Sequence, residues 1–155
     1  MSKLVYLLFV LVGFSVQAQS DSALTHETAL AAVQAAREQA EKEGTTVNIA
    51  IVDAGANLKA FMRMDGSYLG SIDIAIKKAK TARFFDMDTA DLGKLTQPGG
   101  MLYQIELTNG GMVSFPGGVP IKNADGDVIG AIGISGGTIE QDQAIANAGA
   151  QSILN

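Results

Sequence analysis

The sequence lacks cysteine and tryptophan, and it contains a single histidine, His26, and only three prolines. The absence of cysteine excludes thiol catalysis, iron–sulfur clusters and cysteine-ligated zinc. With one histidine, acid–base and metal chemistry based on imidazole is restricted to His26. Basic residues are also scarce, since 11 Lys and Arg stand against 16 Asp and Glu. Because this balance is acidic, we expect no nucleic-acid partner and no binding to anionic membranes.

The first eighteen residues are typical of a secretory signal peptide. Lys3 gives a positive start, an apolar stretch covers residues 4–16, and Ala18 ends a small-residue site ahead of Gln19. The apolar stretch, about nine to thirteen residues, is too short for a membrane-spanning helix, which takes roughly 20 residues. We therefore expect residues 1–18 to be removed and residues 19–155 to form a single domain, periplasmic or secreted, without a membrane span.

Apolar spacing predicts an α+β domain in the mature chain. Helices are expected over 25–44 with Thr25 as the cap, over 71–85, and from 138 to about 154, where Thr138 and Gln141 form a capping-box pattern. Strands are expected over 47–52, 57–62, 112–115, 119–122 and 128–134. Short turns between neighbouring strands favour an antiparallel sheet covered by helices.

Two stretches imitate known motifs without the remaining parts of those motifs. Gly133-Ile-Ser135-Gly-Gly137 fits G-x-S-x-G between a predicted strand and a predicted helix, but no histidine follows it to act as a base. Residues 123–127 begin like a calcium loop, yet Val128 and Ile134 stand where an EF-hand has glycine and glutamate. We interpret the first stretch as a glycine-rich turn and the second as a hairpin turn.

A group of cations and a glycine bend together form the candidate ligand site. Arginine and lysine suit a carboxylate or propionate group, and prolines on both sides of a Gly-Gly pair restrict the backbone of the bend. The alternative interpretation treats Arg63 and Asp65 as a local ion pair and the lysines of the second helix, Lys78 included, as a solvated surface. The candidate ligand-binding residues are Arg63, Asp65, Lys77, Lys80, Pro116, Gly117 and Gly118.

Seven short motifs follow one another along the mature chain. They are Ile51-Val-Asp-Ala-Gly55, Arg63-Met-Asp-Gly66, Lys78-Ala-Lys-Thr-Ala82, Pro116-Gly-Gly-Val-Pro-Ile121, Asp125-Gly126, Ile129-Gly-Ala-Ile-Gly-Ile-Ser-Gly136 and Gln141-Asp-Gln-Ala-Ile-Ala146. Together they resemble the GlcG/HbpS-type family, which also includes the C-terminal domain of PduO-type corrinoid enzymes. The resemblance implies a profilin-like fold, with a five-stranded antiparallel sheet covered by helices on both faces, and assembly into homo-oligomers. It also implies binding of a small ligand, best attested in the family as haem.

The resemblance supports the leading hypothesis, an exported, oligomeric small-ligand-binding protein without catalysis of its own. The sequence is compatible with haem as the ligand. His26 is then the candidate ligand of the iron, with methionine, tyrosine or threonine as other options. Arg63, Lys77 and Lys80 are the candidate partners of the haem propionates.

Two alternatives stay open. The first is an enzyme that acts on a small carboxylic acid, in which Arg63 or Lys80 orients the acid and Asp53 or Asp65 is the base. The second is an assembly module that binds no ligand.

Overall fold

The computed structural model of the chain describes residues 23–154, so the predicted signal peptide, residues 1–18, lies outside the described residues. Four α-helices, four strands and one 3-10 turn follow one another in this part of the chain. They are α1 (His26–Lys42), β1 (Asn48–Asp53), β2 (Leu58–Arg63), α2 (Ser71–Phe85), α3 (Thr89–Leu95), η1 (Ile105–Leu107), β3 (Gly118–Lys122), β4 (Val128–Ser135) and α4 (Ile139–Gln151). Among these residues, no helix combines the length and the apolar character that crossing a bilayer requires.

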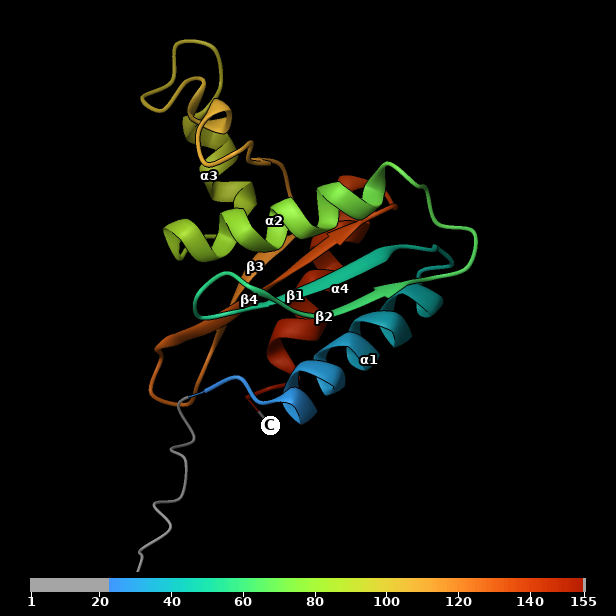
Figure 1. The fold of residues 1–155 in the computed structure, drawn as a ribbon. Helices are drawn as coiled ribbons and strands as arrows, with labels where there is room; N and C mark the ends of the chain where they lie inside the picture. Colours follow the sequence, from blue (N-terminus) through green and yellow to red (C-terminus); the bar gives the residue numbers. More distant parts are fainter. Residues whose placement is uncertain (1–22, 155) are drawn as a thin grey trace, which may run out of the picture.

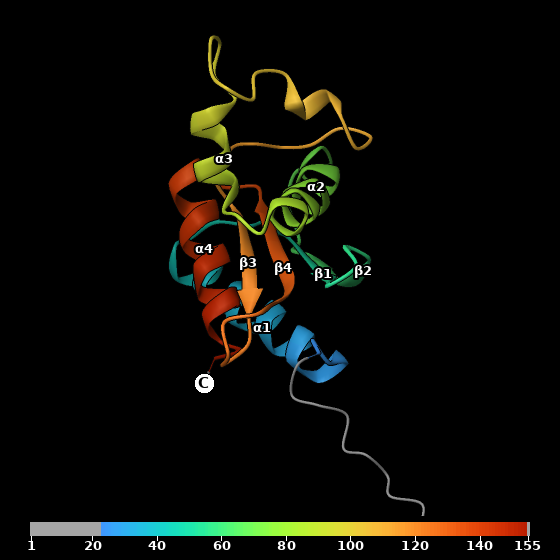
Figure 2. The same ribbon diagram turned by 90° about the vertical axis from the view of Figure 1, so that its left-hand side faces the viewer.

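The strands form one antiparallel sheet in the order β2-β1-β4-β3. Helix α2 lies on one face of the sheet, and α1 and α4 lie on the other (Figures 1 and 2). The α+β class and the helices on both faces are therefore confirmed. The predicted number of strands is not, because the described residues form four strands instead of five.

The missing strand is the one predicted over residues 112–115, and that prediction is wrong. The backbone N–H of Val113 donates to the hydroxyl of Thr81 on α2 at 3.1 Å. The side chain of Ser114 donates to the carboxylate of Glu106 at 2.5 Å. Polar groups of this segment are thus satisfied by side chains, and the segment runs to β3 as an irregular connection.

The two faces of the sheet have cores of different composition. On the α1 and α4 side, large aliphatic residues such as Ile49, Ile132 and Ile134 are fully buried. On the α2 side, the core consists almost entirely of alanine. A Cβ added to Gly133 would lie 2.0 Å from the carbonyl oxygen of Ala75, so the backbone of α2 rests directly on β4. The small-residue face that the sequence predicts for this helix serves this close approach.

Local signals in the sequence correctly predict the helix starts and a turn. Thr25 caps α1 by accepting a hydrogen bond from the backbone of Thr28 at 3.1 Å. Thr138 and Gln141 form the expected capping box at the start of α4. The side chain of Asn123 accepts two backbone hydrogen bonds within the turn between β3 and β4, as expected for a hairpin turn.

Candidate functional site

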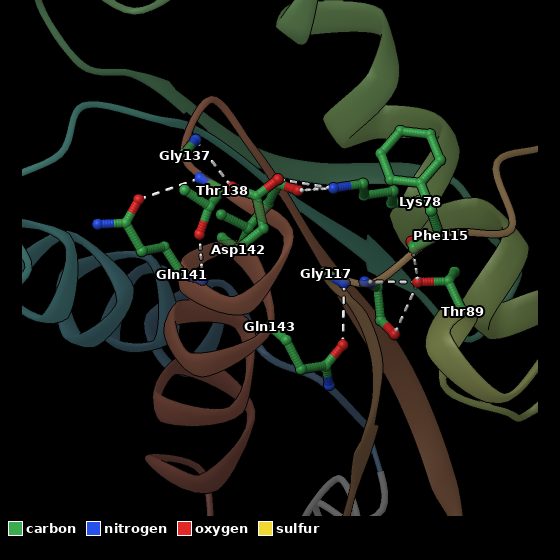
Figure 3. A network of polar contacts seen from close by, with 11 residues as sticks. Lys78, Thr89, Phe115, Gly117, Gly137, Thr138, Gln141, Asp142 and Gln143 are labelled. Carbon is green, nitrogen blue, oxygen red and sulfur yellow. Dashed lines mark hydrogen bonds and ion pairs between the residues drawn. The ribbon is translucent and has the colours of Figure 1, made fainter. Parts of the chain in front are cut away.

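A fully buried lysine joins three elements that are distant in sequence. The amino group of Lys78 on α2 donates to the carboxylate of Asp142 on α4 at 2.7 Å and to the carbonyl of Ile134 on β4 at 2.8 Å (Figure 3). The same amino group lies 4.5 Å from the centre of the Phe115 ring. The expectation that Lys78 lies on the solvated surface of its helix is therefore wrong.

The positions of small residues on α2 explain why Lys78 points inward. Lys78 follows Ala75 by three residues and precedes Ala82 by four, so all three lie on the face that covers the sheet. Lysine is almost never fully buried unless it is paired, and for this reason a surface position is the ordinary expectation for Lys78. The signal that could have found it is its place in the alanine pattern.

The environment of this pair disfavours charge on either partner alone. Desolvation lowers the pKa of Lys78, and the attraction of Asp142 opposes this effect by raising the same pKa. Desolvation likewise raises the pKa of Asp142, against the attraction of Lys78 and a hydrogen bond from the Gly137 backbone. Each charge is therefore kept in the interior by the other. A buried pair of this kind fixes the positions of its elements, and neither group faces solvent.

The predicted glycine bend lies directly on this pair. Gly117 has a φ of +114°, and a Cβ there would lie 2.8 Å from the Lys78 amino group and 2.9 Å from the Asp142 Cβ. The backbone N–H of Gly117 donates to the side chain of Gln143 at 2.9 Å. Glycine is required here for both its conformation and its lack of a side chain.

Thr89 holds the other side of the bend. Its hydroxyl accepts from the backbone of Gly118 at 2.9 Å and donates to the carbonyl of Phe115 at 2.8 Å (Figure 3). Gly117 and Gly118 are both buried, and Pro116 is partly exposed. The bend is thus a fixed part of the interior that ends at the exposed ring of Phe115. Thr89, Asp142 and Gln143, which shape it, were not among the predicted site residues.

Arg63 and Asp65 lie elsewhere, in a hollow of about 430 Å³ beside α1. The guanidinium of Arg63 makes one long hydrogen bond, 3.4 Å, to the carbonyl of Ser67. Across the hollow, Arg37 pairs with Glu41 at 2.5 Å. The residues that line the hollow are Arg37, Glu41, Met62, Arg63, Met64 and Asp65. Cationic, anionic and thioether groups are therefore available here to a small polar ligand.

The sheet order separates this hollow from the glycine bend. Arg63 ends β2 and Gly118 begins β3, and these are the two edge strands. Three interstrand spacings, roughly 14 Å, lie between them. A second hollow, of about 270 Å³, is lined by Pro116 and Phe115 together with residues of α3 and its continuation, including Lys94. Of the predicted residues, only Pro116 lines this second hollow.

The remaining predicted residues are accessible but scattered. Lys77 forms an ion pair with Asp73 on α2 at 2.8 Å, and Lys80 is partly exposed on the same helix. His26 is exposed at the first position of α1. Within residues 23–154, no group of three or more His, Cys, Asp or Glu residues is placed to hold a metal ion.

The comparison with known proteins decides the family. Residues 24–151 match the family model described as haem degrading protein HbpS-like. The chain belongs to the HbpS-like family. This confirms the resemblance that the seven sequence motifs carry.

Members with known structures share the fold of this HbpS-like chain. Protein ORFY of Klebsiella pneumoniae is 34% identical, with a TM-score of 0.81 over 93% of this chain and 97% of its own. The crystal structure of a PduOC–haem complex is 37% identical, with a TM-score of 0.79 over 84% of this chain and 94% of its own. A 15.0 kDa protein of Citrobacter freundii, from the dhaT-dhaS intergenic region, is 37% identical over 84% of this chain and 92% of its own.

Proposed function

We propose that the protein binds haem or a related small acidic ligand, and that it does so as an exported homo-oligomer. The observation that carries the proposal is the relationship to the PduOC domain, which was crystallised with haem and shares the fold at 37% identity over 84% of this chain. Similarity of this extent in both sequence and fold supports a shared ligand class.

The hollow around Arg63 is the first proposed position for the acidic part of the ligand. An arginine with unused donors suits a carboxylate or propionate. Within residues 23–154, the guanidinium of Arg63 makes a single hydrogen bond, the long one to the carbonyl of Ser67. Met62 and Met64 provide apolar and thioether surface in the same hollow. Lys77 and Lys80 are proposed as further propionate partners on α2.

His26 defines a second proposed position, for the iron. It stands at the start of α1, whereas Arg37, which lines the Arg63 hollow, lies eleven residues further along the same helix. At 1.5 Å per residue the two are about 16 Å apart. Iron ligation by His26 and anion binding in the hollow are therefore separable by mutation.

A titration of the purified mature protein with haemin, followed at the Soret band, tests the proposal. We expect a saturable shift for the wild type and a 10-fold or greater loss of affinity for Arg63→Ala, because a hydrogen bond between charged groups contributes about 1.5–3 kcal/mol. His26→Ala should change the Soret maximum if the imidazole binds iron. Lys94→Ala, which removes an exposed lysine paired with Asp91, is the matched control and should bind as the wild type does.

The same titration contains the results that contradict the proposal. A wild type without a saturable shift removes haem as the ligand. Unchanged affinity in Arg63→Ala together with an unchanged spectrum in His26→Ala removes both assigned positions.

A Soret band that decays with time after addition of a reductant in air indicates degradation of haem, the activity named in the family description.

A small carboxylic acid is the second candidate ligand, favoured by the mixed charges and modest volume of the Arg63 hollow. Asp65 lines that hollow, but Asp53 ends β1 at the opposite end from Asn48, the partner of Arg63. Of the two proposed bases, only Asp65 is placed to act with Arg63. In a thermal-shift screen of metabolite acids, a ligand at 100 times its Kd raises the free energy of unfolding by about 2.7 kcal/mol. Stabilisation by an acid and none by haemin favours this candidate.

Export is proposed from residues 1–18 and is tested separately. Fractionation of cells that produce the full chain should recover the protein in the periplasm or the medium. Its N-terminal sequence should then begin at Gln19. Recovery of the full-length chain in the cytoplasm contradicts export.

A further inference from the structure

The hollow of about 270 Å³ beside α3, here called the Phe115 hollow, has no part in the function proposed above. It shares no lining residue with the Arg63 hollow. Its volume lies just below the range of about 300–1,000 Å³ that holds drug-sized ligands, so a ligand of one or two rings fits it. Besides Lys94, the residues that line it are Ala90, Gly93, Gln97, Ser114, Phe115 and Pro116.

The ring of Phe115 gives this hollow an aromatic wall that is fixed in place. Phe115 is 43% exposed, and the amino group of Lys78 lies 4.5 Å from the centre of its ring (Figure 3). The hydroxyl of Thr89 donates to the carbonyl of Phe115 at 2.8 Å and fixes its backbone. An exposed ring in a fixed position suits a ligand with an aromatic ring of its own. Because the ammonium of Lys78 draws the electron density of the ring toward itself, the ring attracts a second cation less strongly.

The hydroxyl of Ser114 faces this hollow as a hydrogen-bond acceptor. It donates to the carboxylate of Glu106 at 2.5 Å, and this bond lowers the pKa of Glu106, so the carboxylate stays ionised and can only accept. A serine hydroxyl has one hydrogen and two acceptor positions. The hydroxyl of Thr96, 3.0 Å away, fills at most one of these positions. The oxygen of Ser114 can therefore accept one further hydrogen bond, from a ligand.

The side chain of Gln97 adds a second acceptor. Its amide nitrogen donates to the carbonyl of Gly93 at 2.8 Å, and this bond fixes which end of the amide is oxygen. The oxygen makes no hydrogen bond within residues 23–154. The charged residue of the lining, Lys94, is paired with Asp91 at 2.7 Å. The hollow thus offers two acceptors and an aromatic wall, and its one charge is compensated.

We propose that the Phe115 hollow binds a neutral, flat nitrogen heterocycle that carries an N–H. The ligand ring packs against Phe115 and Pro116, and its N–H donates to the oxygen of Ser114 or of Gln97. The amide of Gln97 keeps a second N–H, which accommodates a ring acceptor beside the N–H of the ligand. A site of this kind is independent of haem or acid binding at the Arg63 hollow, because the two hollows have different lining residues.

Titration of the purified mature protein with indole and with benzofuran, followed by saturation-transfer NMR, tests the assignment. The two probes have the same ring shape, but benzofuran has an oxygen where indole has its N–H. We expect saturable binding of indole and about 2- to 10-fold weaker binding of benzofuran, the factor that one neutral hydrogen bond contributes. In Gln97→Leu/Ser114→Ala, which lacks both acceptors, the two probes should bind equally. Benzylamine, a cation at neutral pH, should bind more weakly than indole.

Replacement of the aromatic wall tests where the probe binds. Phe115→Leu should weaken indole binding about 2- to 10-fold through loss of the aromatic contact, whereas Phe115→Tyr keeps the ring and should bind as the wild type does. Phe84→Leu is the matched control, because Phe84 on α2 is 45% exposed and does not line the hollow. It should leave indole binding unchanged.

Several results would overturn the inference. They are a wild type that does not bind indole saturably, equal affinity of the wild type for indole and benzofuran, and tighter binding of benzylamine. Unchanged affinity in Phe115→Leu, or an equal loss in Phe84→Leu, overturns the assigned position. A preference for indole that persists in Gln97→Leu/Ser114→Ala also contradicts it. If Phe115→Leu loses the far-ultraviolet circular dichroism of the wild type, the comparison of indole with benzofuran decides alone.

Discussion

Replacement of Lys78 by methionine should destabilise the fold strongly, although the new side chain has a similar length and an apolar character. The amino group of Lys78 is fully buried and makes its hydrogen bonds to Asp142 and Ile134. Removal of one partner from a buried ion pair costs about 3–5 kcal/mol, because the remaining charge keeps its desolvation penalty without compensation. With a urea m-value of about 2 kcal/mol/M, the unfolding midpoint should fall by roughly 1.5–2.5 M.

The neighbouring residue supplies the control for this prediction. Lys77→Met removes a partly exposed pair with Asp73 on the same helix, and such pairs contribute about 0.3–0.5 kcal/mol. The double variant Lys78→Met/Asp142→Asn removes both charges and should lose less free energy of unfolding than the two single variants added together. A midpoint for Lys78→Met no lower than that for Lys77→Met, or strict additivity in the double variant, would refute the reasoning.

Three further changes test other parts of the fold. Gly133→Ala should lower the free energy of unfolding by about 3 kcal/mol or more, since the added Cβ meets the backbone of Ala75. At Gly70 an added Cβ meets open space, so Gly70→Ala is the control and should keep the wild-type Tm. Equal Tm values in both variants would contradict the close packing of α2 on β4. Thr138→Ala should lower the free energy of unfolding in urea by about 1 kcal/mol through loss of the cap, and no loss would show that the cap contributes nothing. Although burial raises the pKa of Asp53, hydrogen bonds from the following turn hold it below its ordinary value of 3.8. The charge of Asp53 therefore stabilises the fold above its ordinary pKa, and this stabilisation is lost as the pH falls through the folded-state pKa. Asp53→Asn should flatten the fall in the urea midpoint between about pH 5 and pH 3. An unchanged slope would contradict the role given to these hydrogen bonds.

The parts of the fold that the sequence predicts correctly depend on local interactions. A capping residue such as Thr25 or Thr138 acts within one helical turn, and the turn at residues 123–126 is closed by the side chain of Asn123. The apolar stretch of residues 47–52, followed by the turn at residues 53–56, likewise predicts the hairpin of β1 and β2. Such interactions join residues a few positions apart, so a short stretch of sequence contains both partners.

The errors concern interactions between distant segments. Residues 112–115 have the composition of a strand, but the hydroxyl of Thr81 on α2 binds Val113 and replaces a strand partner. Which strands become the edges of the sheet also depends on long-range pairing. For this reason spacing alone could not show that Arg63 and Gly118 lie on opposite edges. The alanine pattern could have shown that Lys78 points inward, but not that the glycine bend, 39 residues further along the chain, lies on it.

The contacts of Lys78 also have a consequence for folding kinetics. Its partners Ile134 and Asp142 lie 56 and 64 positions further along the chain. Closing chain segments of this length is entropically costly, so we expect these bonds to form after the rate-limiting step of folding. Loss of the amino group should then accelerate unfolding while the rate of folding changes little. The buried lysine would thus set how long a folded molecule survives, more than how quickly one is made.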